Sequence, residues 1–227
     1  MKLNKLAIAV GVLALSGTAT AEVTANIGAT SNYVWRGVTQ TDDGAAISGG
    51  LDYAHDSGFY AGTWASNVDF NGANAEVDFY AGFGNEFDSG LGYDVGAIYY
   101  FYPGADDLGG NEDEIDFAEV YASVTFGPVT GGINYTVYKE DDDADTNDIY
   151  YYVSASTEVA PTWSLGGTLG YYDFDESDAY SHAQIDVTKD AGDFGEFTFS
   201  LSQIIDDDDL GLDDDLMVFV SWGKTFE

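Results

Sequence analysis

Hydrophobic and polar residues alternate at successive positions through most of this chain. Two clear examples are residues 75–83, AEVDFYAGF, and residues 163–171, WSLGGTLGY. Because successive side chains of a strand point to opposite faces, this period predicts strands with one apolar face. We count about 12 such segments. They are residues 23–36, 45–54, 59–67, 75–87, 91–102, 114–126, 129–138, 149–158, 162–172, 179–188, 195–205 and 215–226.

The connections between these segments alternate in length. Short connections follow the even-numbered segments, as in HDSG at residues 55–58 and GP at 127–128. Longer connections, many of them acidic, follow the odd-numbered segments, as in KEDDDADTND at 139–148 and DDDDLGLDDD at 206–215. With these segment boundaries, short and long connections alternate without exception. It predicts an up-and-down meander in which long loops share one end and short turns the other.

The segment at residues 114–126 has the least regular pattern. Ile115 and Phe117 share a face with Glu119, whereas Val120 and Val124 lie on the opposite face. A β-bulge that resets the alternation within this segment would explain the change.

These patterns predict an all-β fold, an antiparallel up-and-down transmembrane β-barrel with short periplasmic turns and long acidic external loops. The alternative is a water-soluble barrel or sandwich with its apolar faces inside. Two features favour the membrane barrel: the apolar faces are rich in aromatic residues, and the opposite faces carry small or polar residues. Closure pairs every backbone group, as an apolar medium requires.

The first 21 residues resemble a secretory signal peptide. Lys2 and Lys5 precede an apolar stretch at residues 6–15, and the sequence Ala19-Thr20-Ala21 fits a cleavage site. We therefore expect residues 1–21 to be removed and residues 22–227 to form a single outer-membrane β-barrel domain. Export of a chain that contains no cysteine suits a Gram-negative envelope.

The composition adds a strong negative charge. The formal net charge is −35, from 41 acidic and 6 basic residues, so the chain should repel nucleic acid. Aromatic residues make up 15% of the sequence, which argues against disorder despite the charge. There is no cysteine for disulfides or thiolate metal sites, and no cofactor motif, so no cofactor is expected.

The stretch SNYVWRGVTQT at residues 31–41 resembles an element of the TorF-type porin family, S-x-Y-x-x-R-G-x-[ST]-Q-T. The ending VSWGKTFE is similar to the aromatic terminus of that family, although Glu227 follows Phe226. The resemblance covers most of the expected mature chain and implies an outer-membrane barrel with a role in passive transport. It implies no particular solute. The matching residues are Ser31, Tyr33, Arg36, Gly37, Thr39, Gln40 and Thr41.

The sole arginine, Arg36, is expected on the lumen side near the external end of the first strand, opposite Tyr33 and Trp35. It either clamps the first loop to a carboxylate or attracts anions in a constriction. Carboxylates on inward faces would favour cations. The candidates for the channel lining are Asp52, Glu76, Asp78, Asp94, Glu114, Asp116, Asp186 and Glu196.

The acidic loops suggest bound cations. Asp141, Asp143, Asp145 and Asn147 alternate as hard-cation ligands do, but the EF-hand pattern is absent, so no defined metal site is predicted. Diffuse binding of Ca²⁺ or Mg²⁺, which would bridge the loops to lipopolysaccharide phosphates, is one alternative. A solvated acidic fringe is another.

We therefore predict an outer-membrane, porin-like channel for small solutes that favours cations, with outer-membrane lipid and lipopolysaccharide as partners. The alternative is a non-conducting surface barrel whose acidic loops bind divalent cations or an external partner. A hydrolase that uses His182 and one of four strand serines is a third interpretation, which no nucleophile motif supports, so the prediction is that the chain is not an enzyme. The four serines are Ser154, Ser156, Ser200 and Ser202.

Overall fold

The structure is a computed structural model, and it describes residues 22–103, 105, 115–141, 146–207 and 210–227. The expected signal peptide, Glu114, Asp143 and Asp145 lie outside these residues. In the described part of the chain, none of the helices is both long and apolar enough to span a membrane.

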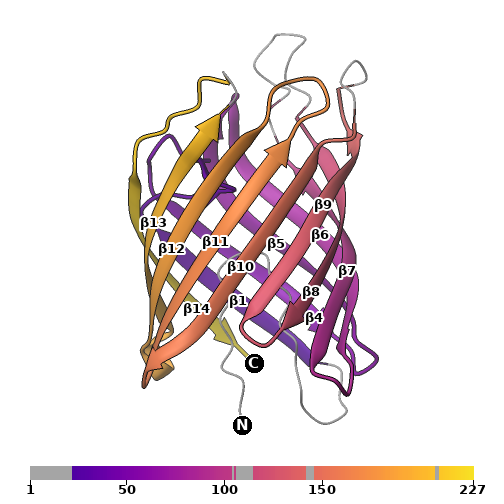
Figure 1. Ribbon diagram of the computed structural model, residues 1–227, viewed down its shortest axis with the longest axis vertical. Helices are drawn as coiled ribbons and strands as arrows, with labels where there is room; N and C mark the ends of the chain where they lie inside the picture. The colour runs from indigo at the N-terminus through magenta and orange to yellow at the C-terminus, as the bar shows by residue number, and fades with distance from the viewer. Residues whose placement is uncertain (1–21, 104, 106–114, 142–145, 208–209) are drawn as a thin grey trace.

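The described residues form a closed antiparallel β-barrel in which consecutive strands pair and β1 closes the sheet with β14 (Figure 1). This confirms the predicted fold class. Because the number of strands is even, Glu22 and Glu227 lie at the same end. The twelve barrel strands are β1 (Glu22–Thr30), β4 (Ala46–Ala54), β5 (Phe59–Phe70), β6 (Ala73–Glu86), β7 (Leu91–Phe101), β8 (Phe117–Phe126), β9 (Val129–Lys139), β10 (Ile149–Ala160), β11 (Trp163–Asp173), β12 (Tyr180–Asp190), β13 (Glu196–Asp207) and β14 (Met217–Phe226).

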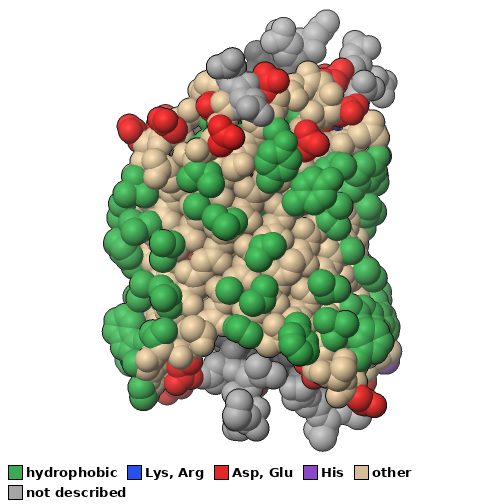
Figure 2. Space-filling view, viewed as in Figure 1, with side chains coloured by type: hydrophobic (Ala, Val, Ile, Leu, Met, Phe, Trp, Pro, Cys, Tyr) green, Lys and Arg blue, Asp and Glu red, His purple; other side chains and the backbone are tan. Residues whose placement is uncertain are grey.

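The apolar faces of the strands point away from the barrel axis. Leu169, Val153 and Ile47 expose 60%, 55% and 68% of their surface, although each lies within a strand. On the face shown in Figure 2, hydrophobic side chains are spread over the whole wall, and Asp and Glu gather at the two rims. A water-soluble barrel would bury these side chains, so the outer surface fits a hydrocarbon surrounding.

The inward faces carry polar side chains, tyrosines and glycines. Tyr80 lies flat over Gly62, where an added Cβ would come within 2.5 Å of the ring, and Tyr60 covers Gly82 in the same way. Because glycine has no side chain, it makes room for a tyrosine of the neighbouring strand, as in other curved sheets. The tyrosine rings packed over glycines therefore fill part of the lumen.

The connection between β5 and β6 corrects the predicted alternation of loop lengths. It is the two-residue turn Asn71-Gly72, with φ angles of 45° and 81°, at the end of the barrel that holds the long loops. Positive φ at both central residues defines a type I′ hairpin turn, and Asn-Gly is its preferred sequence. The flanking strands therefore extend to Phe70 and Ala73, closer together than the periodicity predicted.

The irregular segment at residues 114–126 does not change phase. β8 pairs with β7 without interruption, and Phe117 and Glu119 both lie on its inward face. The register shift lies in the pairing of β8 with β9, where Ala118 and Glu119 face Tyr138 and Thr136. The extra residue is therefore Val137, on the neighbouring strand. Apolar Phe117 points inward because it packs against a loop inside the barrel.

The first predicted segment, residues 23–36, is too long. β1 ends at Thr30, which pairs directly with Ala46 of β4, and the intervening residues turn into the lumen. There they form a separate two-stranded sheet, β2 (Val34–Trp35) and β3 (Val38–Thr39). Their aromatic and β-branched residues favour strand structure, which is why the sequence pattern joined them to β1.

Candidate functional site

The hairpin formed by β2 and β3, residues 34–39, is the most elaborate feature inside the barrel. Its turn is Arg36-Gly37, with φ angles of 49° and 87°, which again are the values of a type I′ turn. An added Cβ on Gly37 would lie 2.5 Å from Cβ of His182 and 3.0 Å from Cδ1 of Ile204. Glycine is thus required both for the backbone angle and for the close approach to the wall.

Arg36 fixes the tip of the hairpin to β8. Its Nη1 and Nη2 atoms donate to Oε1 and Oε2 of Glu119 at 2.7 and 2.6 Å, a bidentate ion pair with side-chain exposures of 6% and 1%. Oε2 of Glu119 also accepts hydrogen bonds from Asn134 Nδ2 at 3.0 Å and from the Tyr100 hydroxyl at 3.3 Å. The buried carboxylate is therefore satisfied by charge and by hydrogen bonds.

Aromatic rings surround the same guanidinium. Its central carbon lies 4.1, 4.3 and 4.9 Å from the ring centroids of Trp35, Tyr150 and Tyr172. Burial lowers the pKa of Arg36, but Glu119 and the neighbouring phenol groups more than offset it, so that the pKa is raised. Arg36 is therefore a permanent cation whose charge is neutralised where it lies.

Tyr33 anchors the other side of the hairpin. Its hydroxyl donates to Oε1 of Glu76 on β6 at 2.8 Å, and its ring packs edge-on against Trp64 at 5.5 Å. Burial, followed by the nearby Glu76 and Asp78 charges, raises the pKa of Tyr33 well above its usual range. The phenol therefore remains protonated and can donate this hydrogen bond.

The remaining residues of the 31–41 motif hold the loop together internally. The Thr41 hydroxyl donates to the Gly44 carbonyl at 2.6 Å, and the Thr39 hydroxyl donates to Asn32 Oδ1 at 2.7 Å. The Gln40 amide donates to the Tyr33 carbonyl at 2.6 Å. The motif thus encodes one compact loop that is docked inside the barrel.

The hairpin and the residue before it, Tyr33, together cross the lumen. Tyr33 contacts β6, whereas the Arg36 carbonyl accepts a hydrogen bond from the Tyr180 hydroxyl of β12 at 3.0 Å. β6 and β12 are separated by five strands in either direction around the closed sheet, so they are opposite walls. A cavity of about 600 Å³ lies beside the hairpin on the long-loop side, and its lining includes Trp35, Val38 and residues of the loops.

The predicted lumen carboxylates occupy two levels. Asp52, Asp94 and Asp186 lie in the half of the barrel toward the short turns. Asp52 accepts hydrogen bonds from Asn26 and Tyr80, and Asp94 accepts one from Tyr60 at 2.7 Å. Asp186 accepts hydrogen bonds from Ser200 at 2.6 Å and Gln184 at 3.0 Å.

The other candidates lie elsewhere. Glu76 and Asp78 are buried next to the hairpin, with 2% and 1% of their surface exposed. Asp116 accepts hydrogen bonds from the Tyr102 amide and the Tyr99 hydroxyl, at 2.8 and 2.6 Å, and so fixes the end of β7. Glu196 faces Asp190 at the short-turn end of the barrel.

Glu119 is the functional residue that the sequence analysis missed among the lumen candidates. A signal was present, since Glu119 is the single charged residue of β8, whose sequence is FAEVYASVTF. A lone buried arginine also demands such a partner. What the sequence could not provide was the pairing over 83 positions.

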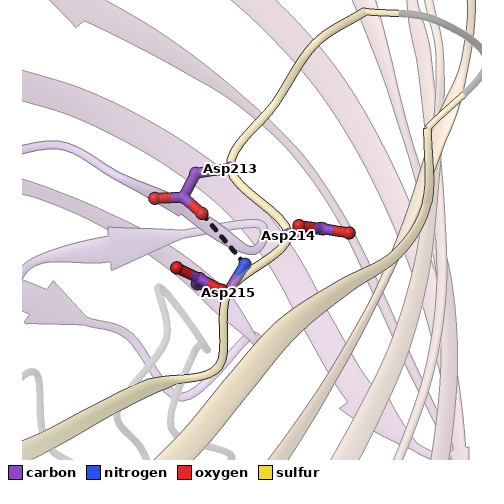
Figure 3. Close-up of side chains that lie close together, drawn as sticks. All are labelled: Asp213, Asp214 and Asp215. Atoms are coloured by element: carbon purple, nitrogen blue, oxygen red, sulfur yellow. Dashed lines mark hydrogen bonds between the residues drawn. The ribbon is translucent and has the colours of Figure 1, made fainter.

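Among the described residues of the acidic loops, one group of three carboxylates lies close together. Asp213, Asp214 and Asp215 lie on the β13–β14 loop, with ligand oxygens within 4.8 Å of one another (Figure 3). All three are exposed, and the contact drawn between them is the Asp215 amide donating to Asp213 Oδ1 at 2.9 Å. In the pattern at residues 141–147, Asn147 donates to Asp175 at 3.1 Å, whereas Asp143 and Asp145 lie outside the described residues.

The two histidines have local partners. His182 Nε2 contacts the Tyr150 hydroxyl at 2.9 Å inside the barrel, and His55 Nδ1 contacts Ser57 at 2.9 Å within the exposed β4–β5 turn. Among the described residues, neither histidine has a hydrogen bond to any of the four strand serines considered above.

Comparison with solved structures supports the architecture. The KdgM porin in complex with disordered oligogalacturonate superimposes with a TM-score of 0.56 at 6% identity, over 92% of this chain and 99% of that chain. OpdL of Pseudomonas aeruginosa gives 0.47 at 11% identity over 90% and 68%, and OccAB4 of Acinetobacter baumannii gives 0.45 at 12% identity over 86% and 56%. These likenesses concern the fold, and the last two are too weak to add to the argument.

No curated protein matches this sequence. Residues 14–211 match the family described as "Bacterial protein of unknown function (Gcw_chp)", whereas none of the comparisons identifies the TorF-type porin family. The match covers most of the chain, including the lumen hairpin with Arg36 and its partner Glu119. The chain therefore belongs to the Gcw_chp family of bacterial proteins.

Proposed function

We propose that this protein is an outer-membrane diffusion channel for small solutes, narrowed by the 34–39 hairpin and selective for cations. The observation that carries the proposal is a closed barrel with an apolar outer wall and a polar lumen that contains fixed charge. The resemblance to TorF-type porins and the likeness in fold to the KdgM porin support the same class of function.

Cation selectivity is inferred from the balance of lumen charge. Asp52, Asp94 and Asp186 project into the short-turn half of the barrel, and Arg36 is neutralised by Glu119. Lys189 and Lys224 contact groups at the short-turn rim. A carboxylate-lined passage favours cations and repels anions. Oligogalacturonate, the ligand in the KdgM complex, is an anion, so a passage lined by carboxylates would disfavour it.

In this proposal Arg36 clamps the first loop instead of attracting anions. Its guanidinium is engaged by both Glu119 oxygens and three rings, which leaves no open face for a passing solute. The histidine contacts favour a channel over a hydrolase, because His182 faces Tyr150 instead of a serine.

Reversal potentials in a planar lipid bilayer under a KCl gradient test the selectivity. We expect the wild type to favour K⁺ and the variant Asp94→Asn/Asp186→Asn to lose a large part of that preference. The matched control is Asp88→Asn/Asp193→Asn, which removes two charges from exposed turns at the same end. Equal reversal potentials for the lumen variant and the wild type would rule out these residues as the source of selectivity.

A second function is favoured by one observation, the contact of the hairpin with opposite walls. In this case the barrel does not conduct, and its acidic loops bind divalent cations diffusely, including those that bridge to lipopolysaccharide. Absence of single-channel steps from the folded wild type, together with steps from a variant without the hairpin, would support this function over the channel.

A further inference from the structure

We propose that Glu76 and Asp78 form a binding site for a hard divalent cation of the Ca²⁺ type, enclosed between the hairpin and the β5–β7 wall. The two residues are two positions apart on β6, so their side chains leave the strand on the same, inward side. Both residues are almost fully buried.

Asp78 is the residue that indicates a bound ligand. Neither of its carboxylate oxygens has a hydrogen-bond partner among the described residues, and both oxygens are buried. Buried carboxylates are otherwise paired, hydrogen-bonded or bound to a metal, because an isolated buried charge is strongly unfavourable. The neighbouring lumen carboxylates Asp52, Asp94 and Glu119 all accept hydrogen bonds.

The four described basic side chains are engaged elsewhere. Arg36 pairs with Glu119, and Lys139 pairs with Asp148 at 2.9 Å. Lys189 contacts Thr162, and Lys224 donates to the Asp193 carbonyl at 2.6 Å. The positive charge that balances Glu76 and Asp78 must therefore be supplied by a ligand or by protons.

The donor set indicates the class of ligand. It consists of two carboxylates and the phenol oxygen of Tyr33, with the Tyr102 side chain beside Glu76. Oxygen donors alone suit Ca²⁺ or a similar hard cation, and two carboxylates match its charge. Ca²⁺ lies about 2.3–2.6 Å from its oxygen ligands, closer than the oxygen of a hydrogen-bonded water, so it suits a tight site.

The site also has a structural consequence. Tyr33 belongs to the hairpin loop and contacts Glu76, so a cation held by Glu76 and Asp78 lies against the point at which the loop docks. Binding would hold the loop more firmly, since a ligand that binds only the docked arrangement stabilises it by mass action. This distinguishes the site from the exposed Asp213–Asp215 group, which touches no part of the hairpin loop in the described contacts.

Terbium luminescence tests the site, because Tb³⁺ replaces Ca²⁺ and is sensitised by nearby tyrosine. The refolded barrel is stripped with chelator and titrated with Tb³⁺, followed by competition with Ca²⁺, Na⁺ and K⁺. We expect one tight site displaced by Ca²⁺, lost in Glu76→Gln/Asp78→Asn. The control Asp213→Asn/Asp214→Asn/Asp215→Asn should retain it, while losing only weak binding.

Thermal unfolding provides a second readout. Ca²⁺ should raise the Tm of the wild type and of the loop control equally. It should not change the Tm of the single variant Asp78→Asn, which replaces the double variant in this test if the double variant does not fold. A tight site that survives in Asp78→Asn, or one lost in the loop control, would contradict the proposal. A wild type that binds no Tb³⁺ tightly would show that protons neutralise the pair instead.

Discussion

At the scale of single residues, Arg36 and Glu119 form the best-defined interaction in the lumen. Both charges are buried, and each is engaged from several directions by hydrogen bonds or aromatic faces. Such a pair need not stabilise the fold more than two apolar residues would, but leaving one charge without its partner is strongly unfavourable. The ion pair therefore specifies where the hairpin tip docks.

A double-mutant cycle tests this interaction. Arg36→Met should lower the free energy of unfolding by about 3–5 kcal/mol, because it leaves the Glu119 carboxylate buried and unpaired. Adding Glu119→Gln should restore a large part of the loss, since the amide oxygen still accepts from Asn134. Urea unfolding in lipid vesicles, followed by tryptophan fluorescence, measures both. Equal losses in the single and the double variant would show that the charge is not what matters.

At the scale of secondary-structure elements, the hairpin differs from the barrel strands in what it contacts. The barrel strands pair edge to edge, whereas β2 and β3 pair only with each other and lie inside the sheet. Their side chains join walls that lie far apart in sequence, as Trp35 does when it packs edge-on against Tyr100, Phe117 and Tyr172. The hairpin thus lies across the lumen as an element separate from the wall.

Replacing residues 31–45 with Asn-Gly should open the lumen. Thr30 and Ala46 are direct partners on β1 and β4, so a two-residue type I′ turn can join them without moving the barrel. We expect a several-fold larger single-channel conductance in planar bilayers, because the groups that bridge β6 and β12 are removed. The variant should still fold, as judged by heat-modifiable migration in electrophoresis. Conductance equal to that of the wild type would show that the hairpin does not limit the current.

At the scale of the whole molecule, the barrel has its apolar side outward and its polar side inward. The adjacent residues Leu169 and Thr168 of β11 illustrate this, since Leu169 is 60% exposed and Thr168 faces the lumen. An apolar outer wall suits a hydrocarbon surrounding, and the closed sheet leaves no unpaired backbone edge that would need water.

Leu169→Arg and Thr168→Arg form a matched pair that tests this orientation. Arginine on the lipid face near the middle of the membrane should lower the free energy of folding into vesicles by about 2–4 kcal/mol. The same residue at position 168 should have a smaller effect, because it can reach lumen water and the carboxylate of Asp186. Denaturant titrations of vesicle-inserted protein provide the measurement. A larger loss at position 168 than at 169 would reverse the assignment of the two faces.

Local pattern was sufficient for most of the barrel. Segments such as 91–102 and 129–138 match β7 and β9 to within one residue at each end, because a strand with one face in lipid must alternate strictly. The same alternation placed Asp52, Asp94 and Asp186 on the inward side. These properties depend only on residues next to one another in sequence.

The pattern failed where the chain leaves the wall. Residues 31–36 continue the strand-like alternation of the first segment, which assigns Tyr33 and Trp35 to the lipid-facing side, yet both lie inside the barrel. The Arg36-Gly37 turn was the available signal, but a type I′ turn requires positive φ at the arginine, and this is common only for residues such as Asn, Asp and Gly.

The sequence by itself determined the alternating strands, their antiparallel order and the sign of the lumen charge. Only the tertiary structure decided that the 31–41 motif folds inward, that Glu119 receives Arg36 and that Asp78 has no hydrogen-bond partner among the described residues. The physical reason is that strand periodicity is a local consequence of lipid and backbone hydrogen bonding. Buried polar pairs instead depend on which distant side chains closure of the barrel brings together.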